Sequence, residues 1–201
     1  MTVDEYFAVL HASWRGELVV CSLGTTGDRW WTTTRSHESF YVNAAMGFAA
    51  SFALGLALAC PDQRVLMLDS DGALAMNLGG LLTEAATQPA NLVHVVLNNR
   101  SYGCLNSAPL VNAELTDYAG VARATGIANV HSVSSAAELT EALRGSATNH
   151  AFIVAEVEKE AERSGFEPPL PLPFDGPEAK YTFGRHLESR RGRPVFGPSG
   201  Y

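Results

Sequence analysis

The sequence has no uninterrupted apolar run of the roughly 18 residues that a membrane-spanning helix requires. Its most apolar stretch, Met46 to Cys60, is rich in glycine and alanine, which fits a buried helix. The chain also does not open with a basic segment followed by an apolar one, the pattern of a secretory signal. We therefore expect a cytoplasmic protein with no membrane partner.

Cysteine and basic residues are scarce as well. The three cysteines are far apart and form no CxxC or Cys/His spacing typical of zinc sites, so free thiols are expected. Lysine and arginine total 14 against 21 acidic residues, which gives a net charge of −7. A nucleic-acid partner is not expected, because phosphate binding needs concentrated positive charge.

What the chain does contain is enough apolar sequence for one core, with 46% hydrophobic residues in a length of 201. Nearly continuous apolar strands alternate with helical patterns, which predicts an α/β fold with a mostly parallel sheet and helices on both faces. Strands are expected at 17–22, 64–69, 91–97, 128–133 and 151–157. Helices are expected at 3–12, 46–59, 73–87, 117–125 and 134–146, whereas 29–42 and 98–115 read as irregular.

A change in composition then predicts a domain boundary. Five prolines lie between Gly165 and Pro177, too many for a helix or a central strand. We divide the chain into a domain at 1–163 and a proline-rich, extended C-terminal arm at 164–201.

Polar residues follow two of the predicted strands at the point where each strand ends. Asp71 follows "VLMLDS", and Asn98 and Asn99 follow "VHVVL". Because ligands of open parallel sheets bind beyond the carboxyl ends of the strands, these side chains should share one crevice. Carboxylate and amide oxygens suit Mg²⁺ or Ca²⁺, and such an ion commonly completes its shell with phosphate oxygens. Gly72 would let the backbone approach an anion at the start of the following helix.

These residues also carry a resemblance. "SDG", 25 further residues and "NN" match the signature of thiamine diphosphate (ThDP) enzymes, which begins Gly-Asp-Gly and ends Asn-Asn. With the upstream "AAMG", the stretch from about Leu18 to Val157 resembles the ThDP-dependent decarboxylases, in particular the β subunit of sulfopyruvate decarboxylase and the C-terminal half of phosphonopyruvate decarboxylase. The fold implied is a single ThDP-binding domain of the diphosphate-binding type.

The resemblance implies a role for each matching residue. Asp71, Asn99 and the Ser101 carbonyl would hold Mg²⁺, and the backbones of Gly72 and Ala73 would touch the diphosphate. A second diphosphate loop would include Gly24 and Thr25, although "GTTG" could equally be a plain turn. The Ala44 carbonyl would accept a hydrogen bond from the cofactor's 4′-amino group. Met46 would form the apolar wedge under the bent cofactor, and ordinary packing is its alternative.

Two departures from the family pattern stand out. Ser70 replaces the first glycine, and "CLNSAP" from Cys104 to Pro109 stands where decarboxylases of this type carry Gly-Gly-Gln near the substrate. The cofactor assignment survives these changes, whereas the identity of the substrate stays open. Cys104 could line the substrate pocket or simply pack.

Two histidines, His37 and His94, are expected to have different environments. His37 precedes the "FYVNAAMG" segment and could act as an acid–base group, but a partly exposed loop histidine is the favoured interpretation. His94 lies inside an apolar strand and is expected to be a core histidine whose hydrogen bonds are satisfied.

The resemblance implies a subunit of a ThDP- and Mg²⁺-dependent decarboxylase of a small 2-oxo acid. Its partner would be a separate pyrimidine-binding α subunit that supplies the activating glutamate, in a heterotetramer or a larger assembly, so the chain alone should be inactive. A carboligase resembling acetolactate synthase and a non-catalytic ThDP-binding partner are the alternatives. A Rossmann-type nucleotide-binding module is disfavoured, because the glycine fingerprint is missing.

Overall fold

The computed structural model describes residues 1–43, 45–159 and 176–197, with only the backbone of Cys104. Six strands form one sheet in the order β2-β1-β3-β4-β8-β7, and every neighbouring pair is parallel. Their bounds are β1 Leu18–Cys21, β2 Phe40–Tyr41, β3 Val65–Ser70, β4 Leu92–Asn98, β7 Val130–Val133 and β8 Ala151–Glu156. A separate two-stranded antiparallel pair is formed by β5 Ser101–Tyr102 and β6 Ala108–Pro109.

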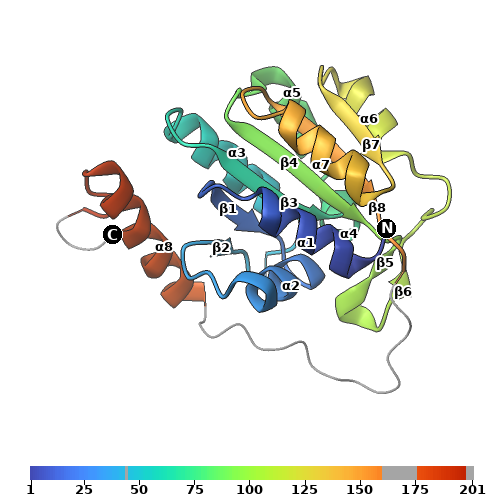
Figure 1. Cartoon of the computed structure of the whole chain (residues 1–201), viewed down its shortest axis with the longest axis horizontal. Helices are drawn as coiled ribbons and strands as arrows, with labels where there is room; N and C mark the ends of the chain where they lie inside the picture. The colour runs from blue at the N-terminus through green and yellow to red at the C-terminus, as the bar shows by residue number, and fades with distance from the viewer. Residues whose placement is uncertain (44, 160–175, 198–201) are drawn as a thin grey trace.

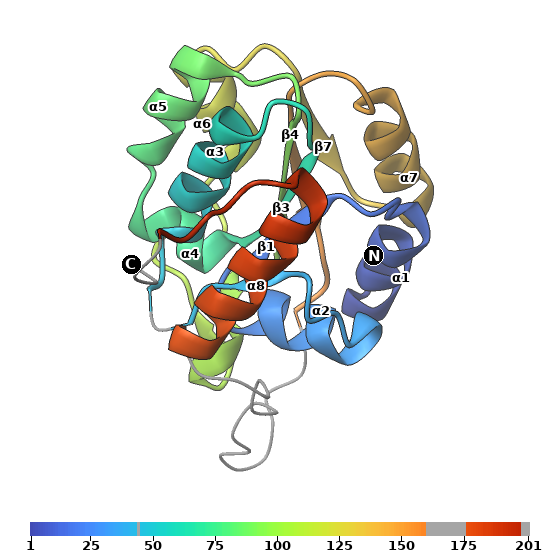
Figure 2. The ribbon, with the colours of Figure 1, turned by 90° about the vertical axis from the view of Figure 1, so that its left-hand side faces the viewer.

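Helices cover both faces of the sheet, as the strand composition predicts (Figures 1 and 2). One face carries α1 Val3–Ser13, α2 Thr25–Thr34 and α7 Ala136–Gly145. The other carries α3 Ala49–Ala59, α4 Asp71–Met76, α5 Gly80–Thr87 and α6 Tyr118–Thr125. A short 3₁₀ turn, η1, spans Gly103–Leu105, and α8 spans Gly176–Arg191. None of the helices in the described part of the chain has the length and apolar character to cross a membrane.

The core is divided by the sheet, because successive strand residues point to opposite faces. Val19, Leu66 and Val93 pack under α1, α2 and α7, whereas their neighbours Leu18, Val65 and Leu92 pack under α3. Burying each such side chain contributes roughly 1.5–3 kcal/mol to folding. Both faces of the central strands are therefore covered by helices and closed to solvent, and only the strand ends are open to ligands.

Three expectations for the helices need correction. The segment after β1, predicted to be irregular, begins with helix α2, whose Trp30 and Trp31 are buried. Helix α3 starts at Ala49 instead of residue 46, because Gly47 adopts a left-handed φ of +87° just before it. The helix predicted at 73–87 is two helices, separated by a break at Asn77, whose side-chain amide donates to the Gly47 carbonyl over 2.9 Å.

The C-terminal segment is also not extended where it is described. Residues 176–191 form α8, which lies against β2 (Figure 1). Phe183 and Leu187 of this helix belong to the same core cluster as α3. Phe183 is 5.3 Å from Phe40 between ring centroids. The prediction of an extended arm is therefore wrong for these residues, and its proline-rich start at 164–175 lies outside the described part. The boundary after residue 163 stays a prediction.

Candidate functional site

The register of the sheet brings the ends of β3 and β4 to the same level. Ser70 lies opposite Leu97, so Asp71 and Asn99 follow their strands side by side. Asp71 also begins helix α4, and the Ser70 side chain caps that helix by accepting a hydrogen bond from the Ala73 N–H over 3.3 Å. The side chains of Asp71 and Asn99 therefore lie at the same end of the sheet, where β3 and β4 finish.

Asp71 is fully buried and is bound by two backbone amides. Its Oδ1 accepts from the Gly72 N–H at 2.7 Å, and its Oδ2 accepts from the Arg100 N–H at 2.5 Å. Arg100 has a left-handed φ of 59°, which turns its amide toward this carboxylate. The hydrogen bond from the Arg100 N–H therefore connects the end of β3 to the segment that carries Asn99 and Ser101. The three predicted metal ligands are thus brought together.

Asn99 and Ser101 are also buried, at 3% and 4% exposure. The Asn99 Oδ1 accepts from the Ser101 N–H at 3.1 Å, whereas the Ser101 hydroxyl is buried with no hydrogen-bond partner. Among the described residues no three side chains of His, Cys, Asp or Glu form a metal cluster. A cation here would be bound by one carboxylate together with amide and carbonyl oxygens, a donor set that suits Mg²⁺.

The charge of Asp71 depends on what occupies the site. Burial raises the pKa of this carboxyl to about 7, although the backbone N–H groups of Gly72, Arg100 and Asn99 act in the opposite direction. A divalent cation beside the carboxyl would favour its ionised form. The residues present therefore fit a metal ion bound at this position.

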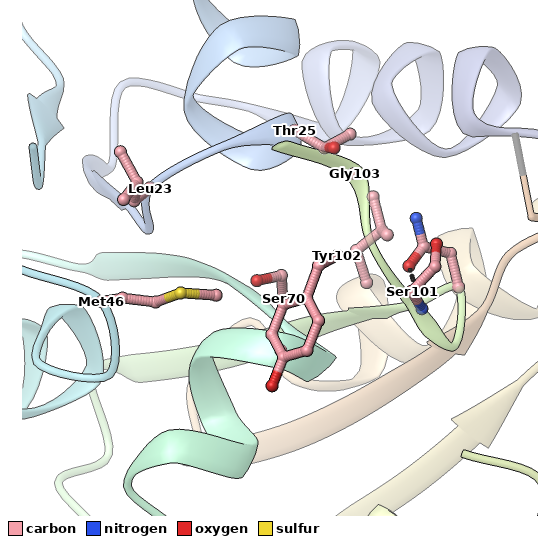
Figure 3. A pocket seen from close by; sticks show the side chains of 10 residues that line it. Leu23, Thr25, Met46, Ser70, Ser101, Tyr102 and Gly103 are labelled. Carbon is pink, nitrogen blue, oxygen red and sulfur yellow. Dashed lines mark hydrogen bonds between the residues drawn. The ribbon is translucent and has the colours of Figure 1, made fainter. Parts of the chain in front are cut away.

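A crevice opens beside these groups, and Figure 3 shows the side chains that line it. Its walls come from the loop after β1, the loop before α3 and the ends of β3 and β4. The lining residues are Leu23, Thr25, Met46, Ser70, Gly72, Leu97, Asn99, Ser101, Tyr102 and Gly103. Its enclosed part measures only about 20 Å³, room for about one water molecule. A cofactor as large as ThDP would therefore lie mostly on an open surface of this chain.

Gly72 faces the middle of the crevice. A Cβ on this residue would come within 2.7 Å of the Tyr102 ring and 3.3 Å of the Met46 Cε. Met46 extends toward Ser70 and Tyr102, as Figure 3 shows, and is half-buried. The predicted wedge residue and the predicted diphosphate turn are thus neighbours. Their roles toward a cofactor stay predictions.

The remaining residues predicted to bind the cofactor differ in their position relative to the crevice. Thr25 lines the crevice and packs against Gly103, whereas Gly24 caps α2 with a φ of 89° and is not part of the lining. Ala73 is buried in the first turn of α4, and Ala44 lies outside the described residues.

The sequence left the roles of His37 and Cys104 open. His37 is exposed and is not among the residues that line the crevice, and its ring packs edge-on against Trp31 at 4.9 Å between centroids. For Cys104 the structure describes only the backbone, in η1, so its predicted part in the substrate pocket is not tested.

The sequence interpretation missed Tyr102 and the Arg100 amide. Tyr102 follows the second asparagine by three positions, so "NNRSYG" contained the signal. A larger cavity of about 330 Å³ lies at the opposite end of the sheet, where Leu10, Trp14, Arg64 and Leu143 are among its walls. It borders the amino ends of β3 and β4, whereas ligands of open parallel sheets bind at the carboxyl ends. The smaller crevice is therefore the candidate site.

Comparison with known proteins agrees with this geometry. Residues 25–157 match the family described as "Thiamine pyrophosphate enzyme, C-terminal TPP binding domain". The sulfopyruvate decarboxylase subunit beta of Methanothermobacter thermautotrophicus is 43% identical over 110 residues, which cover 55% of this chain and 58% of that one. The phosphonopyruvate decarboxylase of Streptomyces hygroscopicus is 38% identical over 127 residues, which cover 63% of this chain and 31% of that one. The aligned part is thus less than two thirds of either relative.

Solved structures show the same fold. A Rhodococcus jostii RHA1 thiamine diphosphate-dependent 4-hydroxybenzoylformate decarboxylase superposes with a TM-score of 0.65 and 24% identity, over 82% of this chain and 33% of that chain. At this identity the likeness concerns the fold alone.

Proposed function

Because this chain belongs to the thiamine pyrophosphate enzyme family, as a C-terminal TPP-binding domain, we propose that it is the diphosphate-binding subunit of a two-component, Mg²⁺-dependent 2-oxo acid decarboxylase. The observation that carries the proposal is the convergence of Asp71, Asn99 and Ser101 beside Gly72. The decarboxylases among its relatives, which include three sulfopyruvate decarboxylase β subunits, support the choice of reaction and of a partner chain.

In this proposal the residues of the chain bind and orient the cofactor. Asp71, Asn99 and the Ser101 carbonyl would hold Mg²⁺, and the backbone of Gly72 and Ala73 would contact the diphosphate. Bound ThDP supplies the electron sink that decarboxylation of a 2-oxo acid requires. Met46, which lines the crevice, would pack against the cofactor as an apolar support.

The same proposal assigns the activating glutamate to a partner. Glu84 is buried in contact with His94 and His150. Glu156 accepts hydrogen bonds from Asn98 and Arg100. Neither is available to contact the cofactor's pyrimidine. The small enclosed volume of the crevice also supports a second chain that covers the rest of the cofactor.

The relatives support a choice of substrate class, because their names specify sulfopyruvate and phosphonopyruvate. We propose that the substrate is a 2-oxo acid with a second anionic group. A carboligase is the competing outcome.

The test measures CO₂ release from sulfopyruvate, phosphonopyruvate and pyruvate, by the chain alone and by the chain co-purified with its partner. We expect ThDP-dependent release only from the assembled complex, and loss of release in Asp71→Asn. Turnover by the chain alone, after mass spectrometry has excluded a partner, would overturn the two-component proposal. Condensed products without aldehyde would identify a carboligase, and ThDP binding without turnover of any 2-oxo acid would identify a non-catalytic partner.

A further inference from the structure

Four buried ionisable side chains form a chain of contacts behind the candidate site. They are Asp69 on β3, Glu84 on α5, His94 on β4 and His150 just before β8, with exposures of 2%, 2%, 1% and 6%. The prediction that His94 is a core histidine with satisfied hydrogen bonds is confirmed. None of the four lines the crevice.

The contacts run from α5 to the end of β3. His94 lies between two carboxylates, with Nδ1 2.9 Å from Glu84 Oε2 and Nε2 3.3 Å from Asp69 Oδ2. The second oxygen of Glu84 accepts from His150 Nε2 at 2.9 Å. Because ionised carboxylates only accept hydrogen bonds, both ring nitrogens of His94 donate, and the ring is a cation.

The charges are consistent with this assignment. Burial alone would lower the pKa of His94, but Glu84 and then Asp69 raise it to about 10. Burial alone would raise the pKa of Glu84, but His94 and His150 bring it to about 2. His94 is therefore protonated and Glu84 ionised throughout the neutral range.

Asp69 connects this chain to the turn that carries the site. Its Oδ1 accepts from the Ser70 N–H at 2.8 Å, while its Oδ2 contacts His94. Ser70 is the capping residue of α4, and Asp71 and Gly72 follow it directly. The His94 imidazolium thus fixes the orientation of the Asp69 carboxylate. The other oxygen of that carboxylate accepts the hydrogen bond from the Ser70 N–H, the first amide of the turn.

Stability alone is a weak explanation for such a cluster. Replacing a buried ion pair with apolar residues of similar volume is often neutral or stabilising, because desolvation offsets the Coulomb attraction. The cluster also leaves the His150 Nδ1 buried with no partner, which adds a cost. What the arrangement does provide is a fixed direction for the Asp69 side chain at the end of β3.

We propose that His94 is a positioning residue: it holds Asp69 against the Ser70 amide and thereby fixes the turn that presents Asp71 and Gly72 to the metal and the diphosphate. The part that concerns metal and diphosphate rests on the proposed function. The part that concerns the turn does not.

Two substitutions of His94 separate its two hydrogen bonds. In His94→Gln the amide nitrogen takes the place of Nε2 and keeps the bond to Asp69, whereas in His94→Asn it takes the place of Nδ1 and keeps only the bond to Glu84. His150→Asn is the matched control, because it removes a bond to the same Glu84 at the far end of the cluster. All three leave the residues of the crevice unchanged.

The first measurement is hydrogen exchange of the peptide from Leu66 to Met76 in the assembled complex without ThDP. We expect faster exchange at the turn in His94→Asn, and exchange near wild type in His94→Gln and His150→Asn. Equal exchange in His94→Asn and His150→Asn would overturn the proposal. If His94→Asn does not fold, Asp69→Asn provides a second variant: it leaves one acceptor oxygen for two donors, so the bond to either His94 or the Ser70 amide is lost, and exchange at the turn should again be faster.

The second measurement is the affinity for ThDP at saturating Mg²⁺. Loss of a group that orients a metal ligand typically weakens binding or activity by about 10–100-fold, so we expect a rise of that size in His94→Asn and rescue in His94→Gln. The turnover number at saturating cofactor should change little. If wild type fails to bind ThDP while the exchange result holds, the proposed function is wrong and the positioning of the turn stands.

Discussion

Gly72→Ala tests whether the middle of the crevice must stay free of side-chain atoms. The added methyl group would lie 2.7 and 2.8 Å from two carbons of the Tyr102 ring. Carbon atoms pack best at about 3.5–4 Å, so the ring must move by roughly 1 Å. Overpacking of this kind costs about 1–3 kcal/mol, while the loss of glycine's freedom in the unfolded chain returns about 0.4–1 kcal/mol. The net loss in the free energy of unfolding should lie between about 0 and 2.6 kcal/mol.

The effect on ligand binding should exceed the effect on stability. The methyl group enters a crevice whose enclosed volume is about 20 Å³, directly above the turn proposed to hold the diphosphate. We expect the ThDP affinity of the assembled complex to fall at least tenfold, or about 1.4 kcal/mol, by calorimetry at saturating Mg²⁺.

Gly55→Ala provides the control for this substitution. Gly55 is an exposed residue inside α3, and a Cβ there meets nothing within 4 Å. Alanine should stabilise that helix by about 0.5–1 kcal/mol and leave ThDP binding unchanged. If Gly72→Ala binds ThDP as tightly as Gly55→Ala does, the diphosphate does not lie against this turn.

Three further predictions concern the metal, the wedge and the buried cluster. Asp71→Ala should abolish Mg²⁺-dependent ThDP binding, and Asn99→Ala should weaken it strongly. If calorimetry shows undiminished ThDP affinity in Asp71→Ala, the metal assignment is wrong. Met46→Ala should lower turnover more than cofactor affinity in steady-state assays. The volume-conserving Met46→Leu should have only a mild effect. Equal activity of Met46→Ala and wild type would show that Met46 is an ordinary packing residue. The pKa of His94 is raised from 6.5 to about 10, so its contribution to stability is complete below pH 6.5 and is lost as the pH rises through 10. Urea midpoints should therefore fall over this range more steeply in wild type than in His94→Gln. The pKa of Glu84 is lowered from 4.5 to about 2, so its contribution is complete above pH 4.5 and is lost as the pH falls through 2.

The central sheet and the core of the site were predictable from local pattern. Apolar runs such as "RVLMLD" and "NLVHVVL" are long enough to specify buried parallel strands, and the rule that ligands bind at strand ends then pairs Asp71 with Asn99. The structure brings these two side chains together through the Arg100 amide. That contact depends on a left-handed residue between two ligands, which no periodicity reveals.

Other features depend on contacts that a local pattern does not contain. The segment "RWWTTT" is poor in strong helix formers, and α2 forms because Trp30 and Trp31 are buried under the sheet. The break between α4 and α5 is fixed by the bond from Asn77 to Gly47, 30 residues earlier. Helix α8 follows a proline-rich stretch, and its anchor Phe183 finds its partners in distant Phe40 and Phe52.

The position of α8 has a consequence for how this protein can associate with others. β2 is the outermost strand on its side of the sheet, and an open strand edge is a template for another chain to continue the sheet. Here that edge is only two residues long, and α8 lies against it. Growth of the sheet across this boundary is therefore blocked, and any assembly on this side must use side-chain surfaces in place of backbone pairing. A chain that lost α8 would uncover both the strand edge and the aromatic rings of Phe40 and Phe52, which is a route to aggregation.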